Sequence, residues 1–143
     1  MKLRVAWIGK TKERALQSLT LEYLKRLSRY NPTESLELAS EDSLVKQLDR
    51  SGQVLVALEC RGKQMSSEEL AQFVADHQNR GTQALLFAVG PADGWSEAML
   101  CAATVKLSLG RMTLPHELAR VVLLEQLYRA FTILKGHPYH LGH

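Results

Sequence analysis

Apolar runs alternate with helical patterns along nearly the whole chain. The strongest strand patterns are LRVAWIG (3–9), QVLVALE (53–59) and TQALLFAVG (82–90). Residues 53–59 form a near-continuous run of branched apolar side chains, which is typical of a strand buried on both faces and predicts a central place in the sheet. Two weaker strands are predicted at SLELAS (35–40) and TVKLSLG (104–110).

Helical spacing of apolar residues predicts helices between these strands. They cover residues 11–30, a segment through Leu44 that ends near Gly52, and residues 66–81, 96–103 and 114–135. Ser66 or Ser67, with Glu69 three residues after Ser66, is the expected start of the third helix, and Gly81 its end. Strict alternation of strand and helix predicts one α/β domain over residues 1–143, a mostly parallel sheet with helices on both faces.

The last predicted helix has clear boundary signals and a broad apolar surface. Thr113 is a possible N-cap, Pro115 stands in the first turn, Lys135 in the last turn, and Gly136 just beyond it. Apolar residues cover more than one narrow stripe of this helix, so we expect it to pack on the sheet and also on something else, of which a partner subunit is one candidate.

Polar residues interrupt the same helix and dominate the tail that follows it. Glu125 and Arg129 are spaced i, i+4 and can form an ion pair, which could belong to a functional site or equally well be an ordinary surface pair. Arg120 is a third polar position on this helix. The tail GHPYHLGH (136–143) is expected to be too short to form another element. Its three histidines would need a fixed geometry to bind a metal, and we expect none.

Composition and charge limit the classes of protein that fit. With 45% hydrophobic and 23% charged residues, the chain is an ordinary globular protein. A net charge of +3 permits a polyanionic partner without requiring one. Basic residues concentrate between Lys10 and Arg29, where a solvated helix face is the alternative explanation. Two distant cysteines, Cys60 and Cys101, and an apolar run too short for a membrane span predict free thiols and a cytoplasmic protein.

Loops that follow strands are where an open parallel sheet binds ligands. Four such loops pair glycine with polar residues, at 9–12, 59–62, 90–94 and 110–113. None carries the dinucleotide or phosphate-loop glycine pattern, which excludes those two cofactor classes. The glycines allow close backbone approach to a ligand, while a plain turn remains the simpler explanation for each one alone.

A specific resemblance covers essentially the whole chain. The segment MTLPHELARVVLLEQLYRAFTILKGHPYH (112–140) closely resembles the C-terminal signature of the RlmH family, small SPOUT-class methyltransferases that act on a pseudouridine of bacterial large-subunit ribosomal RNA. Further matching segments are IGKTKERALQSLTLEYLKRL, LECRGKQMSSEELA, VGPADGW and KLSLGRMTLPH. The resemblance implies a C-terminal trefoil knot, a homodimer, and S-adenosylmethionine as the methyl donor.

By position, the resemblance also implies a set of site residues. The cofactor would be held by Leu58, Gly90, Pro91, Leu109, Gly110, Arg111, Met112, Thr113 and Leu114. Pseudouridine N3 carries a hydrogen, so a group near the target must accept a proton during methylation. Tyr139 and His140 are implied to reach the partner's cleft, where His140 would orient the base and accept a proton. Arg129 and the basic N-terminal face would then bind RNA phosphates.

The chain departs from the family pattern at two positions. Pro91 stands where the family usually has a second glycine, so one backbone N–H is missing there. Leu141 stands where a basic residue is usual, which removes an expected phosphate contact. These departures leave open a second function, a non-catalytic ribosome-binding protein that keeps the fold. An unrelated small-molecule enzyme would need a nucleophile or metal set, which we do not find in the sequence.

Overall fold

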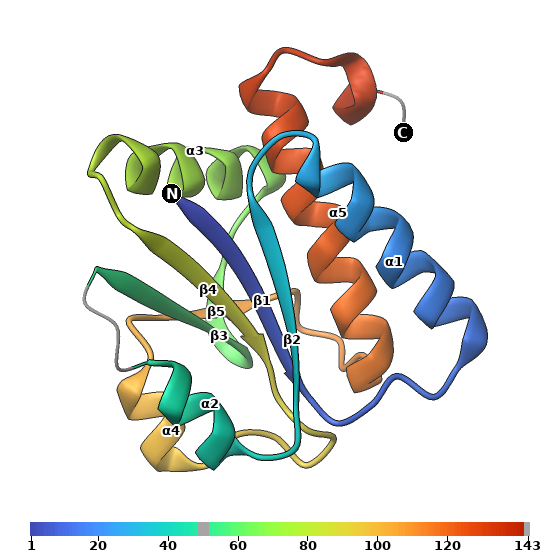
Figure 1. Cartoon of the computed structure of the whole chain (residues 1–143), viewed down its shortest axis with the longest axis vertical. Helices are drawn as coiled ribbons and strands as arrows, with labels where there is room; N and C mark the ends of the chain where they lie inside the picture. The colour runs from blue at the N-terminus through green and yellow to red at the C-terminus, as the bar shows by residue number, and fades with distance from the viewer. Residues whose placement is uncertain (49–51, 142–143) are drawn as a thin grey trace.

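The computed structural model describes residues 1–48 and 52–141. Within these residues, five parallel strands form one sheet in the order β2-β1-β4-β3-β5 (Figure 1). Their bounds are β1 (Lys2–Ile8), β2 (Thr33–Leu38), β3 (Gln53–Gln64), β4 (Ala84–Val89) and β5 (Val105–Ser108). The predicted parallel α/β architecture is confirmed, and all the carboxyl ends of these strands meet at one edge.

Helices cover both faces of the sheet, as expected. On one face lie α1 (Arg14–Ser28), α3 (Ser67–Asn79) and α5 (His116–Leu134); on the other lie α2 (Glu41–Gln47) and α4 (Glu97–Ala102) (Figure 1). The apolar core therefore divides in two. Successive residues of β4 pack into different parts of this core. Leu85 and Phe87 belong to the larger part, and Leu86 belongs to the smaller part on the other face of the sheet. Each such buried side chain contributes about 1.5–3 kcal/mol.

Strand β3 differs from its prediction in place and length. The central strand is β4, whereas β3 lies between β4 and β5. The second difference is that β3 continues to Gln64, with a register shift between Leu58 and Lys63 before it pairs again with β5. The added residues are mostly polar, so the hydrophobic pattern could not reveal them.

Capping signals in the sequence predicted the start of α3 correctly and the start of α5 incorrectly. At α3, Ser66 Oγ accepts from the N–H of Glu69 at 3.0 Å, and Glu69 Oε1 accepts from the N–H of Ser66 at 2.9 Å, which confirms the predicted capping box. At α5 the predicted start is wrong: Pro115 occupies the N-cap and no side chain caps the helix. Because a residue before proline avoids the helical region, the helix cannot begin at Leu114, and Thr113 is left in the preceding loop.

The tail forms one more element, contrary to the prediction that it was too short. Residues Pro138–Leu141 make a 3-10 turn, η1, that packs back on the C-terminal end of α5. Gly136 adopts φ +68° at the helix end, as the sequence predicted, and this left-handed residue reverses the chain direction. The tail is therefore ordered against the fold through Leu141.

Candidate active site

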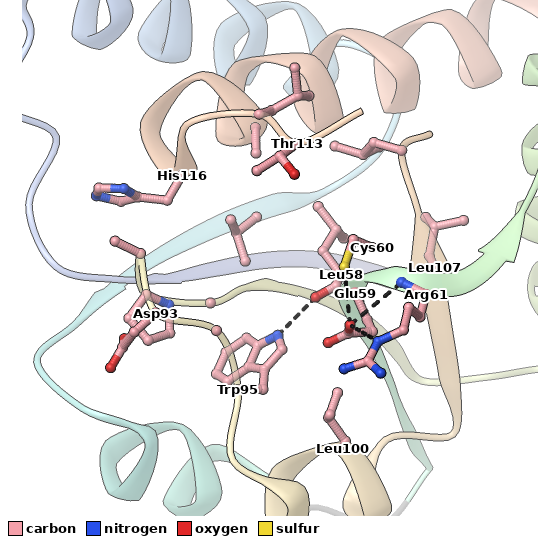
Figure 2. Close-up of a pocket in the computed structure, with 18 of the residues that line it drawn as sticks. Leu58, Glu59, Cys60, Arg61, Asp93, Trp95, Leu100, Leu107, Thr113 and His116 are labelled. Carbon is pink, nitrogen blue, oxygen red and sulfur yellow. Dashed lines mark hydrogen bonds and ion pairs between the residues drawn. The ribbon is translucent and has the colours of Figure 1, made fainter. Parts of the chain in front are cut away.

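A cavity of about 550 Å³ opens where the strands end, at the carboxyl edge of the sheet (Figure 2). Its walls come from the end of β3, the loop between β4 and α4, and the loop between β5 and α5 with the first turn of α5. A parallel α/β sheet binds ligands at this edge. The lining residues are Leu58, Glu59, Cys60, Arg61, Val89, Gly90, Pro91, Ala92, Asp93, Gly94, Trp95, Glu97, Leu100, Leu107, Leu109, Gly110, Met112, Thr113, Leu114, His116 and Ala119.

Most residues that the family resemblance assigns to the cofactor lie together in this cavity. Eight of the nine line it: Leu58, Gly90, Pro91, Leu109, Gly110, Met112, Thr113 and Leu114. The ninth, Arg111, is exposed and is not part of the lining. Three segments far apart in the sequence thus supply one set of walls, although their binding of a cofactor remains a prediction.

The indole of Trp95 forms one wall and fixes the β4–α4 loop. Its Nε1 donates to the carbonyl oxygen of Leu58 at 3.0 Å, so the loop after β4 is joined to the end of β3 (Figure 2). A Cβ at Gly90 would lie 2.9 Å from Trp95 Cε2, closer than real Cβ contacts allow. Glycine at this position is therefore required by packing against the ring rather than by an unusual φ angle.

The β5–α5 loop is tied to the same end of β3. Ser108 Oγ lies 3.1 Å from the carbonyl oxygen of Cys60 and 2.9 Å from that of Gly110, and it accepts from the N–H of Gly110 at 3.1 Å. Gly62 has no room for a Cβ, which would meet the backbone of Lys106 at 2.6 Å. The polar extension of β3 thus holds the loop that closes the cavity.

Polar and charged side chains accompany the apolar walls of the cavity. Arg61 Nε lies 4.0 Å from Glu59 Oε1, and the Arg61 side chain is almost fully exposed. Asp93 and His116 lie on the opposite side of the opening from this pair (Figure 2). Leu58, Leu107 and Leu114 give the interior an apolar lining. Such a site suits a ligand with a flat apolar part and a polar end.

The residues predicted to handle the target base lie elsewhere in the same protomer. Tyr139 and His140 belong to η1, at the C-terminal end of α5, whereas the cavity meets the N-terminal end of that helix. Because α5 has 19 residues, its ends are about 28 Å apart. Neither residue, nor Arg129, lines the cavity of its own chain.

Tyr139 is the centre of an aromatic cluster that holds the tail. Its ring packs edge-on against Tyr128 at 4.6 Å between centroids, and its hydroxyl lies 3.4 Å from that of Tyr23. Arg129 places its guanidinium 5.1 Å from the Tyr139 ring centroid while its Nε donates to Glu125 at 2.7 Å. The predicted Glu125–Arg129 pair is confirmed. Burial and the Tyr23 hydroxyl raise the pKa of Tyr139 above its ordinary value, so it stays protonated.

Several lining residues were not singled out from the sequence. Trp95 and His116 sit in quoted segments, but nothing in the hydrophobic pattern separates a lining indole from a core one. Glu59 is the last residue of the predicted strand QVLVALE, and Cys60 and Arg61 follow it in the predicted loop 59–62. Their signal was their place at the end of a strand, which predicted the loop but not the side chains.

The part of the chain that the structure describes contains neither a metal-binding cluster nor a membrane-spanning helix. In residues 1–48 and 52–141, no group of three or more His, Cys, Asp or Glu side chains could hold a metal ion. The third tail histidine, His143, lies outside the described residues. Among the described helices, none is long and apolar enough to cross a membrane. Cys60 and Cys101 are both free and exposed.

The chain is similar over its whole length to known methyltransferases. A family model described as "Predicted SPOUT methyltransferase" matches residues 1–140. A protein of Koribacter versatilis called ribosomal RNA large subunit methyltransferase H is 64% identical, with 100% of both chains covered. The protein of that name from Geobacter sp. strain M21 is 42% identical, over 98% of this chain and 99% of its own.

A solved structure supports the fold independently. A probable methylase family protein from Haemophilus influenzae superposes with a TM-score of 0.63 over 96% of this chain and 69% of its own, at 13% sequence identity. That likeness concerns the fold alone. Together with the cavity at the strand ends and the full-length family match, these similarities show that the chain belongs to the RlmH family of SPOUT methyltransferases.

Proposed function

We propose that this protein methylates N3 of a pseudouridine in bacterial large-subunit ribosomal RNA, with S-adenosylmethionine as the methyl donor. The observation that carries the proposal is the gathering of Leu58, the turn at Gly90 and the loop 109–114 around one cavity of about 550 Å³. Small-molecule sites span about 300–1,000 Å³, so a nucleoside-sized donor fits. The relatives' names supply the substrate class.

The residues that would hold the donor are those of the three walls. Leu58, Leu107 and Leu114 would pack against its apolar surface, and the backbone at Gly90 and Gly110 would approach it closely. S-adenosylmethionine, when bound, supplies an electrophilic methyl group on sulfur. The walls exclude water and fix the direction in which the target can approach, and this alignment is the main source of rate enhancement that the site can offer.

The tail supplies the group that receives the proton from the target base. His140 Nδ1 lies 2.9 Å from the carbonyl oxygen of His137. Because a carbonyl only accepts, Nδ1 carries the hydrogen in this contact and Nε2 is the basic nitrogen. Tyr139 stays protonated and can donate a hydrogen bond to the base. Arg129, held by Glu125, packs on the Tyr139 ring and keeps the tail in place.

A homodimer follows from the separation of tail and cavity. Since about 28 Å of helix lies between them, the tail of one protomer would serve the cavity of the other. We further propose that residues 1–143 form one SPOUT methyltransferase domain with a C-terminal trefoil knot, acting in the cytoplasm where ribosomes reside. A knotted chain that is stretched from both termini should reach a shorter end-to-end length than an unknotted chain with the same number of residues.

Mass spectrometry of nucleosides tests the central proposal. Purified protein, S-adenosylmethionine and ribosomes lacking the mark should yield N3-methylated pseudouridine. Because the chain has no separate RNA-binding module in its described part, assembled ribosomes should be better substrates than free RNA. Absence of methyl gain on unmodified ribosomes would refute the enzymatic function, and equal activity on naked RNA fragments would refute the preference for ribosomes.

A non-catalytic ribosome-binding protein is the second candidate, favoured by Pro91 and Leu141. Pro91 lines the cavity and cannot donate a backbone hydrogen bond to a ligand. Calorimetry with S-adenosylmethionine separates the two functions. Micromolar donor affinity supports the enzyme, whereas ribosome binding without donor affinity supports the binding protein.

A further inference from the structure

The loop between β1 and α1, residues 9–13, is fixed by α5 more firmly than an ordinary surface loop. We propose that Glu117 and Arg120 are positioning residues that hold this loop as a phosphate-binding surface for the RNA substrate, in register with the cavity. The inference rests on the proposed function and adds to it two residues without an assigned role. Contacts from α5 order this loop, which distinguishes it from an ordinary basic patch on a surface.

Glu117 holds the backbone of the loop. Its Oε1 accepts hydrogen bonds from the backbone N–H of Lys12 at 2.7 Å and from that of Glu13 at 3.1 Å. These backbone hydrogen bonds lower the pKa of Glu117, so the carboxylate is charged at neutral pH. Helix α1 begins at Arg14 without any side-chain cap of its own. The carboxylate of Glu117 therefore orders the chain immediately before α1.

Arg120 holds the other end of the same loop. Its side chain is fully buried, and its guanidinium donates to the carbonyl oxygen of Ile8 at 2.8 Å and to Thr11 Oγ1 at 2.9 Å. The guanidinium also lies 5.6 Å from the Trp7 ring centroid. Every one of these partners belongs to the end of β1 or to the loop.

The burial of Arg120 carries a cost that packing alone does not explain. Among the described residues it has no carboxylate within ion-pair distance, and its Nε has no hydrogen-bond partner. A buried, unpaired charge is destabilising relative to an apolar side chain of similar volume. The hydrogen bonds of Arg120 to Ile8 and Thr11 indicate its role: it fixes the loop and adds positive electrostatic potential beneath the loop.

The loop presents cations on its outer side. Lys10 and Lys12 are exposed, as is Arg14 in the first turn of α1, and none of the three forms an ion pair within the described residues. Free exposed cations with a fixed backbone suit the regularly spaced phosphates of RNA. Such contacts set the position of the nucleic acid without reading its bases.

The same turns of α5 face the cavity and the loop. His116 and Ala119 line the cavity, and the next residue after each, Glu117 and Arg120, contacts the loop. At the strand level, Trp7 of β1 is in register with Val89 of β4, and Val89 also lines the cavity. A phosphate held at Lys12 would therefore keep a fixed position relative to the methyl donor.

A double-mutant cycle on Glu117 and Lys12 tests the clamp. Lys12→Ala should raise KM for large subunits about fivefold and reduce the slope of log affinity against log salt by about 1. Glu117→Ala should give a similar increase in KM, with kcat and S-adenosylmethionine affinity unchanged. The double variant should be impaired by less than the sum of the two single effects, because Glu117 acts partly through Lys12. Glu117→Gln, which keeps an accepting oxygen, should stay within about twofold of wild type.

Controls distinguish a clamp from a merely structural role. Lys46→Ala, an exposed charge on α2 at the opposite face, should leave KM unchanged. Thr11→Val removes one acceptor of the buried Arg120, so it should raise KM and lower the melting temperature by a few degrees, whereas Thr11→Ser keeps the hydroxyl and should leave both unchanged. Arg120→Lys should raise KM, since a single ammonium group cannot reach both acceptors.

Two readouts separate this inference from the proposed function. If wild type fails to methylate, the proposed function fails, and equilibrium binding of the variants to large subunits still decides the inference. Additive effects of Glu117→Ala and Lys12→Ala, or unchanged subunit affinity in both, would overturn the clamp. Loss of S-adenosylmethionine affinity in Glu117→Ala with unchanged subunit affinity would also overturn it and assign the loop to the cofactor.

Discussion

At Gly90 the cavity wall has no room for a side chain. We expect Gly90→Ala to push the Trp95 ring away, since the new Cβ would lie 2.9 Å from Cε2, and to break the bond from Nε1 to the Leu58 carbonyl. Loss of a buried hydrogen bond costs about 1–3 kcal/mol. Because both partners line the cavity, S-adenosylmethionine affinity measured by calorimetry should fall about tenfold or more.

Gly81→Ala is the matched control for this prediction. Gly81 lies beyond α3 with φ +76° and no atom near the position of a Cβ. Alanine there should lower the free energy of unfolding by about 1–2 kcal/mol through backbone strain, and it should leave donor affinity unchanged. Equal donor affinity in wild type and Gly90→Ala would contradict the assignment of this wall to the cofactor.

His77 makes stability depend on pH. Its ring is buried, with Nδ1 2.8 Å from Thr82 Oγ1, and burial lowers its pKa in the folded protein. The unfolded chain therefore binds a proton at His77 more readily than the folded protein does. The stability that the neutral, buried His77 contributes is present above about pH 6.5 and is lost as pH falls toward the pKa of His77 in the folded protein. Melting temperature should fall between pH 7.5 and 5.5, and His77→Gln should reduce that fall. An unchanged pH dependence in the variant would contradict the prediction.

At the scale of elements, the start of α3 can be weakened without touching the core. Ser66→Ala removes the acceptor of the Glu69 N–H and should lower the free energy of unfolding by about 1 kcal/mol. Urea denaturation at one fixed protein concentration measures the change. Ser28→Ala is the control, because that hydroxyl bonds the Leu24 carbonyl inside α1 and caps nothing. A loss at Ser28 equal to that at Ser66 would argue against a specific cap.

The sequence predicted those elements whose signals are local. The strands β1 and β4 carry their own hydrophobic pattern, and α3 carries its own cap, so both kinds of element were found with nearly correct bounds. The end of β3 is different. Residues after Leu58 are polar, and they stay extended because Gly62 passes against the Lys106 backbone, a contact between segments that the sequence places far apart.

The start of α5 and the tail were missed for related reasons. Thr113 resembles an N-cap, yet Pro115 keeps Leu114 out of the helix, and both Thr113 and Leu114 line the cavity instead. The tail turn depends on Tyr139 packing against Tyr128 and Tyr23, which is tertiary contact. The cavity loops at 59–62, 90–94 and 110–113 were predicted from their place after strands, and the individual cofactor residues came from family resemblance. Trp95 and the Glu117–Arg120 clamp required the structure.

At the scale of the whole molecule, one chain contains two halves of the proposed site at separate places. The cavity lies at the N-terminal end of α5 and the Tyr139–His140 tail at its C-terminal end. In the proposed mechanism the active centre needs both, so we expect it to form between two protomers. We therefore predict that activity is a property of the dimer and that dilution below the dissociation constant abolishes it.

Complementation between two defective variants tests this arrangement. His140→Ala keeps an intact cavity, and Gly90→Ala keeps an intact tail, so each homodimer should be nearly inactive when the donor concentration is kept well below the weakened Kd of the Gly90→Ala cavity. In a heterodimer, the tail of the Gly90→Ala protomer meets the cavity of the His140→Ala protomer and restores one of two sites. Random exchange makes half of the dimers mixed, so ribosome methylation should recover to roughly a quarter of the wild-type rate.

Subunit exchange must be shown in the same mixture, for example by co-purification of differently tagged protomers. Mixing Gly90→Ala with a double variant that carries both changes is the matched negative control, because no dimer in that mixture combines a sound cavity with a sound tail from the other chain. Recovery only in the first mixture would establish a shared site. Exchange without recovery would mean that the tail acts on the cavity of its own chain or does not act in catalysis. Because α5 holds the tail and the cavity of one chain about 28 Å apart, action within one chain would require a large rearrangement.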